Sequence, residues 1–302
     1  MKLLDRCLTA LMPLLPRALV WRVAKRYVAG VTVEDALSAV RDINSRGASA
    51  TLDILGEEIS TVEEADRNRD AYIELLDAID AGGVDANISI KPTAFGLHLD
   101  EGAAFERVKA VLVRARDLGN FMRIDMEDSS TTTATLGLYR SLRGEGFTNV
   151  GIVLQAYMHR TLQDISDHTE WQPDYRLCKG IYVEPEEVAI QGRGEINDNY
   201  MAALQSMLRS GSFVGIATHD HALVDRSMEC VASCDSEGTQ HEFQMLLGVD
   251  PVLGGRILNE GHRLRIYVPF GHDWYAYSTR RLQENPTIGR YVFKALFRRK
   301  AP

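Results

Sequence analysis

Four polar residues near the C-terminus are spaced so that they would share one face of a helix, and their side chains could bind a small carboxylic acid. A phenol, two guanidiniums and a carboxylate stand at positions i, i+3, i+4 and i+7, which places them on one broad helix face. Two adjacent arginines suit bidentate capture of a carboxylate group. The alternative is a solvent-exposed helix face with an i,i+4 Arg–Glu pair. The four residues are Tyr277, Arg280, Arg281 and Glu284.

The predicted helix directly follows a predicted strand. The segment Leu264–Pro269 is rich in β-branched and aromatic residues, as expected for a short buried strand, and Gly271 ends it. Asp273 can cap a helix that begins at Trp274, and Pro286 ends that helix. The two arginines would therefore lie close to the carboxyl end of a strand.

Polar residues also follow or interrupt other apolar runs along the chain, where a purely structural core would continue. Because the carboxyl ends of parallel strands meet at one edge of a sheet or barrel, we expect these side chains to form a ring around one mouth. Two of them, from neighbouring strands, are expected to form an ion pair: Lys91 and Asp125. The whole ring comprises Lys91, Asp125, Gln155, Arg176, Lys179, Thr218, His219 and Gln244.

The elements that must position this ring alternate between short apolar runs and amphipathic segments. Eight candidate strands separated by helical stretches match the rhythm of a (β/α)8 barrel, an α/β fold with a typical length of about 250 residues. The predicted strands are Ala50–Leu55, Asn87–Lys91, Phe121–Asp125, Gly151–Gln155, Tyr175–Gly180, Phe213–Thr218, Glu242–Leu247 and Leu264–Pro269. The clearest helices between them are Thr61–Ala81, Gly102–Leu118, Thr132–Gly144 and Asp198–Gly211.

The main alternative fold is a doubly wound open sheet. Such a sheet usually carries a glycine-rich phosphate turn after its first strand, and the segment Asp53–Glu58 has no such fingerprint. Residues 1–46 contain only helical patterns, including one helix from about Val31 to Ser45. We therefore expect a helical N-terminal arm over 1–46 and one TIM-like barrel domain over 47–302, whose C-terminal helix carries the arginines.

Composition narrows the class of protein. The 302-residue chain has 45% hydrophobic residues and a net charge of −8, which argues against a nucleic-acid-binding surface. Its four cysteines form no CxxC pair, which favours a reducing cytosol over a zinc site or a disulfide framework. The apolar segment Met1–Leu19 is broken by charges and prolines, so it predicts neither a transmembrane span nor a signal peptide.

The sequence also offers a metal-dependent interpretation. His219 and His221 form a His-x-His pair that, together with Asp125, could serve a metal-dependent barrel hydrolase. In such hydrolases the pair normally ends the first strand, whereas here it ends the sixth, so we expect no metal site. A third alternative is a barrel that binds an amino acid without converting it.

Five segments, each at the end of a predicted strand, follow one another in the order found in the proline dehydrogenases. The chain therefore resembles that family. This family consists of flavin-dependent (β/α)8 enzymes that begin proline catabolism, and the resemblance spans roughly residues 53–286. No aldehyde-dehydrogenase signature is present, so the chain is similar to the monofunctional form. The segments are Arg123–Asp128, Tyr175–Glu184, Ala217–Asp220, Glu242–Gly248 and Arg265–Pro286.

The resemblance implies a substrate site and an FAD site. Asp125 and Arg176 would take the catalytic roles, with Gln155 and Arg176 near the flavin ring and Thr218 and His219 near the ribityl–pyrophosphate part. The residues implied in binding L-proline are Lys91, Tyr267, Tyr277, Arg280, Arg281 and Glu284. The residues implied along the FAD are Met126, Gln155, Arg176, Lys179, Gly180, Ile181, Thr218 and His219.

The resemblance also implies a reaction. Hydride would pass from C5 of L-proline to flavin N5, giving Δ1-pyrroline-5-carboxylate, while the protein supplies position and electrostatics. Electrons would then pass to a quinone, which implies a cytoplasmic protein with transient contact at a membrane surface. The base for the amine proton is not named by the sequence; we expect Asp125 with Lys91 to tune the site, or a water molecule to take the proton.

The arginine pair gives a direct test. We expect Arg280→Met and Arg281→Met each to lower kcat/KM for proline about 30- to 1000-fold, because losing a charge-assisted partner in a closed pocket costs about 2–4 kcal/mol. Arg→Lys should restore only part of the activity, and FAD content should stay near normal. Steady-state kinetics with proline measure this. An exposed pair contributes about 0–1 kcal/mol, so parental kinetics in both Met variants would support a solvent-exposed helix instead.

Overall fold

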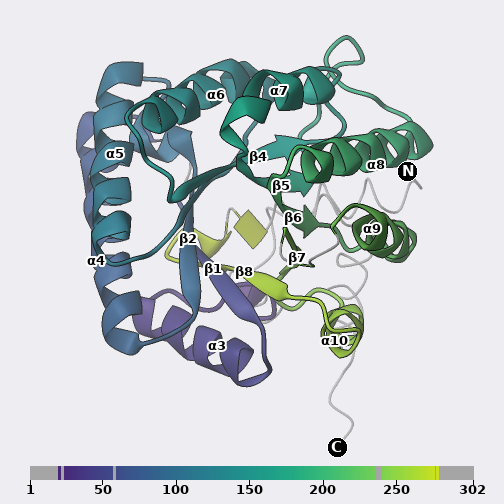
Figure 1. The fold of residues 1–302 in the computed structure, drawn as a ribbon. Helices are drawn as coiled ribbons and strands as arrows, with labels where there is room; N and C mark the ends of the chain where they lie inside the picture. Colours follow the sequence, from purple (N-terminus) through teal and green to yellow (C-terminus); the bar gives the residue numbers. More distant parts are fainter. Residues whose placement is uncertain are drawn as a thin grey trace, which may run out of the picture.

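The computed structural model describes residues 20–21, 24–56, 59–235, 238, 240–275 and 277–278 of the chain. In this described part, eight parallel strands each pair with the next, and the last pairs with the first, so that the sheet closes into a barrel (Figure 1). The predicted (β/α)8 fold is confirmed. The strands are β1 Ser49–Ile54, β2 Ala86–Ile90, β3 Met122–Ile124, β4 Val150–Gln155, β5 Asp174–Cys178, β6 Phe213–Ala217, β7 His241–Leu246 and β8 Leu264–Phe270.

Each predicted strand agrees with an observed one to within two residues at either end. The largest difference lies at β5, which ends at Cys178 because Gly180 turns the chain with a positive φ of 110°. Outward-facing strand residues such as Leu52, Ile88 and Ile216 are fully buried beneath the helices. Burial of each such side chain contributes about 1.5–3 kcal/mol to the stability of the fold. These positions are therefore apolar, which makes the strands recognisable in the sequence.

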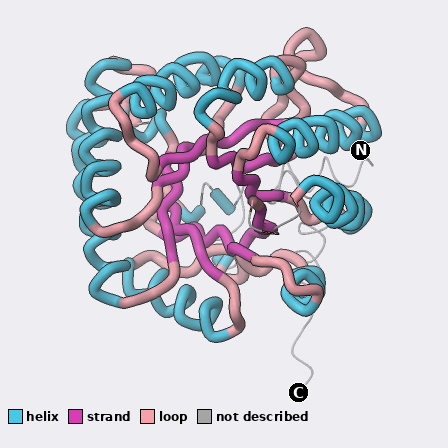
Figure 2. The backbone as a smooth tube through the Cα atoms, in the orientation of Figure 1, coloured by secondary structure: helices cyan, strands magenta, loops and turns pink. Residues whose placement is uncertain are grey.

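The helices form an outer ring around the strands (Figure 2). Four of the segments predicted as helices between strands are observed, as α4, α5, α6 and α8. Among the described residues, the helices between and before the strands are α3 Val33–Ser45, α4 Val62–Gly82, α5 Glu101–Asp117, α6 Ser129–Gly144, α7 Thr161–His168, α8 Arg193–Arg209, α9 His221–Cys234 and α10 Pro251–Asn259, with short 3-10 helices η2 Pro92–Phe95 and η3 Thr169–Trp171.

Local sequence determines where the first helices begin. Thr32 caps α3 and Thr61 caps α4, each in a capping box in which an acidic side chain three residues later bonds back to the cap backbone. Helix α3 lies against β1 and β8, where the barrel closes (Figure 1). It corresponds to the last part of the predicted N-terminal arm; the division of the chain at residue 47 stays a prediction.

The C-terminal helix is seen only at its start. It begins at Trp274, as predicted, and the Tyr277 N–H donates to the Asp273 carbonyl oxygen at 3.3 Å. Arg280, Arg281 and Glu284 lie outside the described residues, as does the segment 1–19. Among the helices that are described, none has both the length and the apolar character needed to cross a lipid bilayer.

The inside of the barrel is charged, in contrast to the branched aliphatic side chains that usually fill such barrels. Successive strand residues point to opposite faces, so every second residue faces inward. Two of the ion pairs found there join β3 to β5, which are not neighbours in the sheet, so these side chains must cross the interior. Among the described residues the interior pairs are Lys91–Asp53, Arg176–Asp125, Arg265–Glu242 and Arg123–Asp174.

Two strand glycines leave space for these long side chains. A Cβ atom on Gly151 of β4 would lie 2.3 Å from Nη1 of Arg123 and 2.5 Å from the carbonyl oxygen of Asp174. A Cβ atom on Gly215 of β6 would lie 2.3 Å from Nε2 of Gln244. Glycine is therefore required at both positions by the polar packing of the interior, since even one methyl group would overlap with a neighbour.

We expect Gly151→Ala to destabilise the fold by about 1–3 kcal/mol, because the added methyl group displaces a buried arginine and meets backbone. Gly137→Ala is the matched control: Gly137 lies inside α6, and a methyl group added there would have nothing within 4 Å, so this change should stabilise the helix by up to about 1 kcal/mol. Urea unfolding of both variants measures the difference. Equal stabilities would show that the barrel interior has room to relax.

Candidate active site

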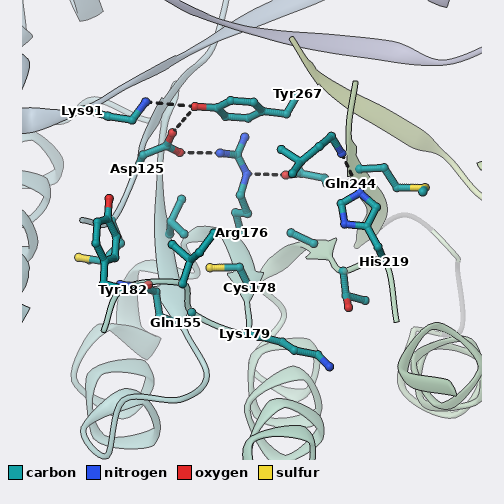
Figure 3. A pocket seen from close by; sticks show the side chains of 18 of the residues that line it. Lys91, Asp125, Gln155, Arg176, Cys178, Lys179, Tyr182, His219, Gln244 and Tyr267 are labelled. Carbon is teal, nitrogen blue, oxygen red and sulfur yellow. Dashed lines mark hydrogen bonds and ion pairs between the residues drawn. The ribbon is translucent and has the colours of Figure 1, made fainter. Parts of the chain in front are cut away.

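A cavity of about 670 Å³ opens at the carboxyl ends of the strands. This volume is typical of a small-molecule or cofactor site. Its walls bring together predicted site residues from the ends of β2, β3, β4, β5, β6, β7 and β8 (Figure 3). One further predicted residue comes from the C-terminal helix. The predicted residues that line it are Lys91, Asp125, Met126, Gln155, Arg176, Lys179, Gly180, Ile181, Thr218, His219, Gln244, Tyr267 and Tyr277.

Arg176 of β5 lies at the centre of the polar side of this cavity (Figure 3). Its Nη1 donates to Oδ1 of Asp125 at 2.5 Å, its Nε donates to Oε1 of Gln244 at 2.5 Å, and its Nη2 donates to Oγ of Ser89 at 3.1 Å. The guanidinium carbon also lies 5.2 Å from the ring centroid of Tyr267, a cation–π distance. The side chain is thus held from four strands besides its own, with its position fixed before any ligand binds.

The predicted ion pair between Lys91 and Asp125 is wrong. Nζ of Lys91 instead pairs with Oδ2 of Asp53 at 2.8 Å, and Asp125 pairs with Arg176. The hydroxyl of Tyr267 lies between the two predicted partners: it accepts from Nζ of Lys91 at 3.4 Å and donates to Oδ2 of Asp125 at 2.9 Å. Burial and the nearby Asp125 carboxylate raise the pKa of Tyr267 well above its ordinary value, so the phenol stays a hydrogen-bond donor.

The opposite side of the cavity carries hydrogen-bonding groups suited to a larger polar ligand. Nε2 of Gln155 donates to the carbonyl oxygen of Glu127 at 2.7 Å, which fixes the orientation of its amide. Nζ of Lys179 pairs with Asp220 at 2.7 Å, and this hydrogen bond is the main cause that lowers the pKa of Asp220. Because both side chains are about a quarter exposed, the pair lies at the rim, where an incoming anion can reach the lysine.

His219 presents a defined face to the same cavity. Its Nε2 accepts a hydrogen bond of 3.0 Å from the backbone N–H of Leu246 on the neighbouring strand. A ring nitrogen that accepts cannot carry the proton, so the neutral ring carries it on Nδ1.

The turn after β5 depends on Gly180. A Cβ atom there would lie 2.1 Å from the ring of Tyr157, so a side chain is excluded by space as well as by the positive φ. The three residues that follow Gly180 line the cavity. Ile181 is 43% exposed there and Val183 is fully exposed.

Several residues that contact the side chains lining the cavity escaped the sequence prediction. Ser89 supports Arg176, Asp53 supports Lys91, and Glu242 supports Gln244. Each stands two positions before or after another polar residue on the same strand, or in register with one on the next strand. A period-two pattern of polar residues within predicted strands could therefore have identified them as inward-facing.

The geometry does not support the metal-dependent alternative. His221 is the first residue of α9, and its Nε2 bonds to Oδ2 of Asp250 at 2.7 Å on the outside of the barrel, away from the residues that line the cavity. Asp125 is engaged by Arg176 and Tyr267. Within the described ranges, no three His, Cys, Asp or Glu side chains group in a way that could hold a metal ion.

Comparison with known proteins decides the family. The family profile described as Proline dehydrogenase matches residues 36–291. The chain belongs to the proline dehydrogenase family. It is 34% identical to Proline dehydrogenase of Deinococcus radiodurans over 94% of this chain and 93% of that protein, and 35% identical to Proline dehydrogenase 1 of Bacillus subtilis subsp. natto over 91% of each. Proline dehydrogenases are oxidoreductases, and this chain spans more than nine tenths of the length of both relatives.

Solved structures agree on the fold. The chain superposes on Proline utilization A (PutA) from Bdellovibrio bacteriovorus, inactivated by N-propargylglycine, with a TM-score of 0.82 at 24% identity. The match to PutA from Corynebacterium freiburgense has a TM-score of 0.78 at 24% identity. These matches cover 88% and 96% of this chain, which spans about a third of each of those longer chains (33% and 34%). At these identities the likeness shows the barrel fold alone.

We expect Tyr267→Phe to lower kcat/KM for proline about 5- to 150-fold, because Asp125 then loses one donor and a buried acceptor left unpaired costs about 1–3 kcal/mol. Tyr200→Phe is the matched control, since it removes another buried phenol hydroxyl, bonded to the Leu177 carbonyl oxygen at 3.0 Å, away from the cavity lining. Steady-state kinetics and thermal unfolding of both variants separate the effects. If the control loses as much activity, the Tyr267 result reflects stability alone.

Proposed function

We propose that this chain oxidises L-proline to Δ1-pyrroline-5-carboxylate with FAD as cofactor. Membership of the proline dehydrogenase family supports the substrate. The observation that carries the proposal is the cavity at the strand ends, where a guanidinium buried to 7% exposure and held by three polar partners faces an otherwise mainly apolar space. A fixed positive charge beside an apolar pocket suits a reaction in which negative charge accumulates on a flat aromatic cofactor.

The residues present fit a flavin. Cofactor sites are concave, mostly apolar and supplied with a few well-placed polar groups. Met126, Val153 and Leu246 line the cavity with apolar surface, while Arg176 and Lys179 offer cationic donors. When bound, FAD would accept the hydride released from C5 of proline.

The substrate would lie on the side of Lys91, Asp125 and Tyr267. Tyr277 lines the same cavity and is 7% exposed, because its ring packs against Leu55 and Val28. That packing fixes the phenol ring at the wall where a small aliphatic ring would rest. We propose that the adjacent Arg280 and Arg281, supported by Glu284, bind the proline carboxylate.

Asp125 acts in this proposal by positioning and not as the base. One of its oxygens accepts from Arg176 and the other from Tyr267, so its charge is already engaged. Its carboxylate holds the guanidinium and the phenol at fixed angles, and removal of the amine proton falls to water. The quinone acceptor implied by the family would approach at the cavity mouth, where Ile181 and Val183 expose apolar surface.

We expect the purified protein to carry non-covalent FAD that bleaches when L-proline is added without oxygen. Acid or heat should release the flavin intact, because the cavity offers hydrogen bonds and charges and the proposal assigns no covalent link. Absorbance and fluorescence spectra measure both effects. Full proline oxidation by protein refolded without flavin would contradict the proposal, as would loss of activity to a chelator with retention of all flavin.

Substrate preference tests the placement of Tyr277. L-proline should be preferred over 4-hydroxyproline, because a C4 hydroxyl resting against the phenol ring loses hydration without gaining a partner, at a cost of about 1–3 kcal/mol. Tyr277→Ser should narrow this difference. The ratio of kcat/KM for the two substrates measures it, and equal values in the parent enzyme would place C4 away from Tyr277.

A further inference from the structure

Gln244 of β7 lies between a positive and a negative charge inside the barrel, and the family resemblance gives it neither a substrate-binding nor a cofactor-binding role. Its Oε1 accepts from Nε of Arg176 at 2.5 Å, while its Nε2 donates to Oε1 of Glu242 at 2.7 Å. Both contacts are buried, with Gln244 5% and Glu242 4% exposed. An amide placed in this way has only one workable orientation, since the flipped amide would direct its N–H groups at a guanidinium.

Glu242 fixes that orientation, and its own negative charge is paired with Arg265 of β8. Nε of Arg265 donates to Oε1 of Glu242 at 2.7 Å, and Nη1 of Arg265 donates to the Ala50 carbonyl oxygen at 2.8 Å. The absence of a side chain at Gly215 gives the Gln244 amide the space to turn toward Glu242. A continuous chain of donors and acceptors therefore runs from Arg265 through Glu242 and Gln244 to Arg176.

This arrangement keeps the carboxylate of Glu242 out of the cavity lining. Arg176 forms a direct ion pair with Asp125, and on its other side it meets the neutral amide oxygen of Gln244. Glu242 lies two residues earlier on the same strand, so its charge is one inward-facing position further from the mouth. In a low-dielectric interior, moving one charge by this distance changes the electrostatic potential at the cavity substantially.

We propose that Gln244, oriented by Glu242, is a positioning residue that holds Arg176 through a neutral contact and so preserves positive potential at the flavin. This rests on the proposed function, because it requires FAD in the cavity. Its consequence is specific: an acid at position 244 would hold Arg176 equally well but would make the flavin harder to reduce.

The decisive variant exchanges the two residues. In Glu242→Gln/Gln244→Glu, the Arg265 side chain can donate to the new amide oxygen, the amide N–H can donate to the new carboxylate, and the carboxylate can accept from Arg176. Net charge and every partner are kept while the negative charge moves one position toward the cavity. We expect the two-electron reduction equilibrium of the bound flavin to shift at least about tenfold toward the oxidised form, about 30 mV.

The single variant Gln244→Glu places two carboxylates side by side, so one of them must bind a proton. Its folded-state pKa is then raised above the unfolded value of about 4.3, and the stability relative to the parent should fall as pH rises from there. The exchange variant should remove this pH dependence. Thermal unfolding of flavin-free protein across pH 5–8 measures it without FAD.

Gln244→Met provides a second test, because it keeps the volume and removes both polar contacts. We expect FAD binding to weaken about tenfold, since Arg176 loses one of its fixed partners. Gln163→Met is the matched control: Gln163 lies on the surface of α7, bonded to Asp167, and FAD affinity should not change. Flavin fluorescence titration gives both dissociation constants.

The outcomes separate the two proposals. A parent protein that binds no FAD contradicts the proposed function, and the unfolding series still reports on the Glu242–Gln244 contact. A parent that binds FAD, with an exchange variant of unchanged reduction potential, overturns the role of Gln244 alone. The role of Gln244 is also overturned if the exchange variant is no more stable than Gln244→Glu. That result would mean that the hydrogen-bond series from Arg265 to Arg176 does not hold these side chains in place.

Discussion

Charges buried inside the barrel are the constraint on which this structure depends. An unpaired charge in a protein interior costs several kcal/mol, and breaking one buried pair typically costs about 3–5 kcal/mol. The interior is therefore stable only if each buried basic side chain pairs with an acidic one. Arg176 pairs with Asp125 and Arg123 pairs with Asp174, and both pairs link β3 with β5. Strand register, the glycines that admit long side chains, and the shape of the cavity floor all follow from these contacts.

The same contacts prepare the site for chemistry. Arg176 reaches the cavity with its position fixed by Asp125, Gln244 and Ser89, so little reorganisation is needed when a ligand arrives. The hydroxyl of Tyr267 links Lys91 to Asp125 and keeps both groups in one network. Stability and function thus share the same residues, and a change to one of them is expected to affect both.

Much of this was accessible from sequence. The outward-facing strand residues are apolar and buried beneath the helices, so all eight strands were predicted to within two residues, and a polar residue after an apolar run marked the ends of several strands. That reasoning brought Lys91, Asp125 and Gln155 to one mouth, where the structure places them. The order of the five segments indicated the proline dehydrogenase family, and the comparisons then established that the chain belongs to it.

The sequence by itself determined the fold, the family and most of the polar residues that line the described cavity, because these depend on local patterns and their order along the chain. Only the tertiary structure decided which charge meets which: Lys91 pairs with Asp53 and not with Asp125, and His221 turns outward to Asp250. Such choices depend on the stagger of neighbouring strands and on side chains that cross the barrel between distant ones. No local pattern contains that information, since the partners are brought together only when the sheet closes.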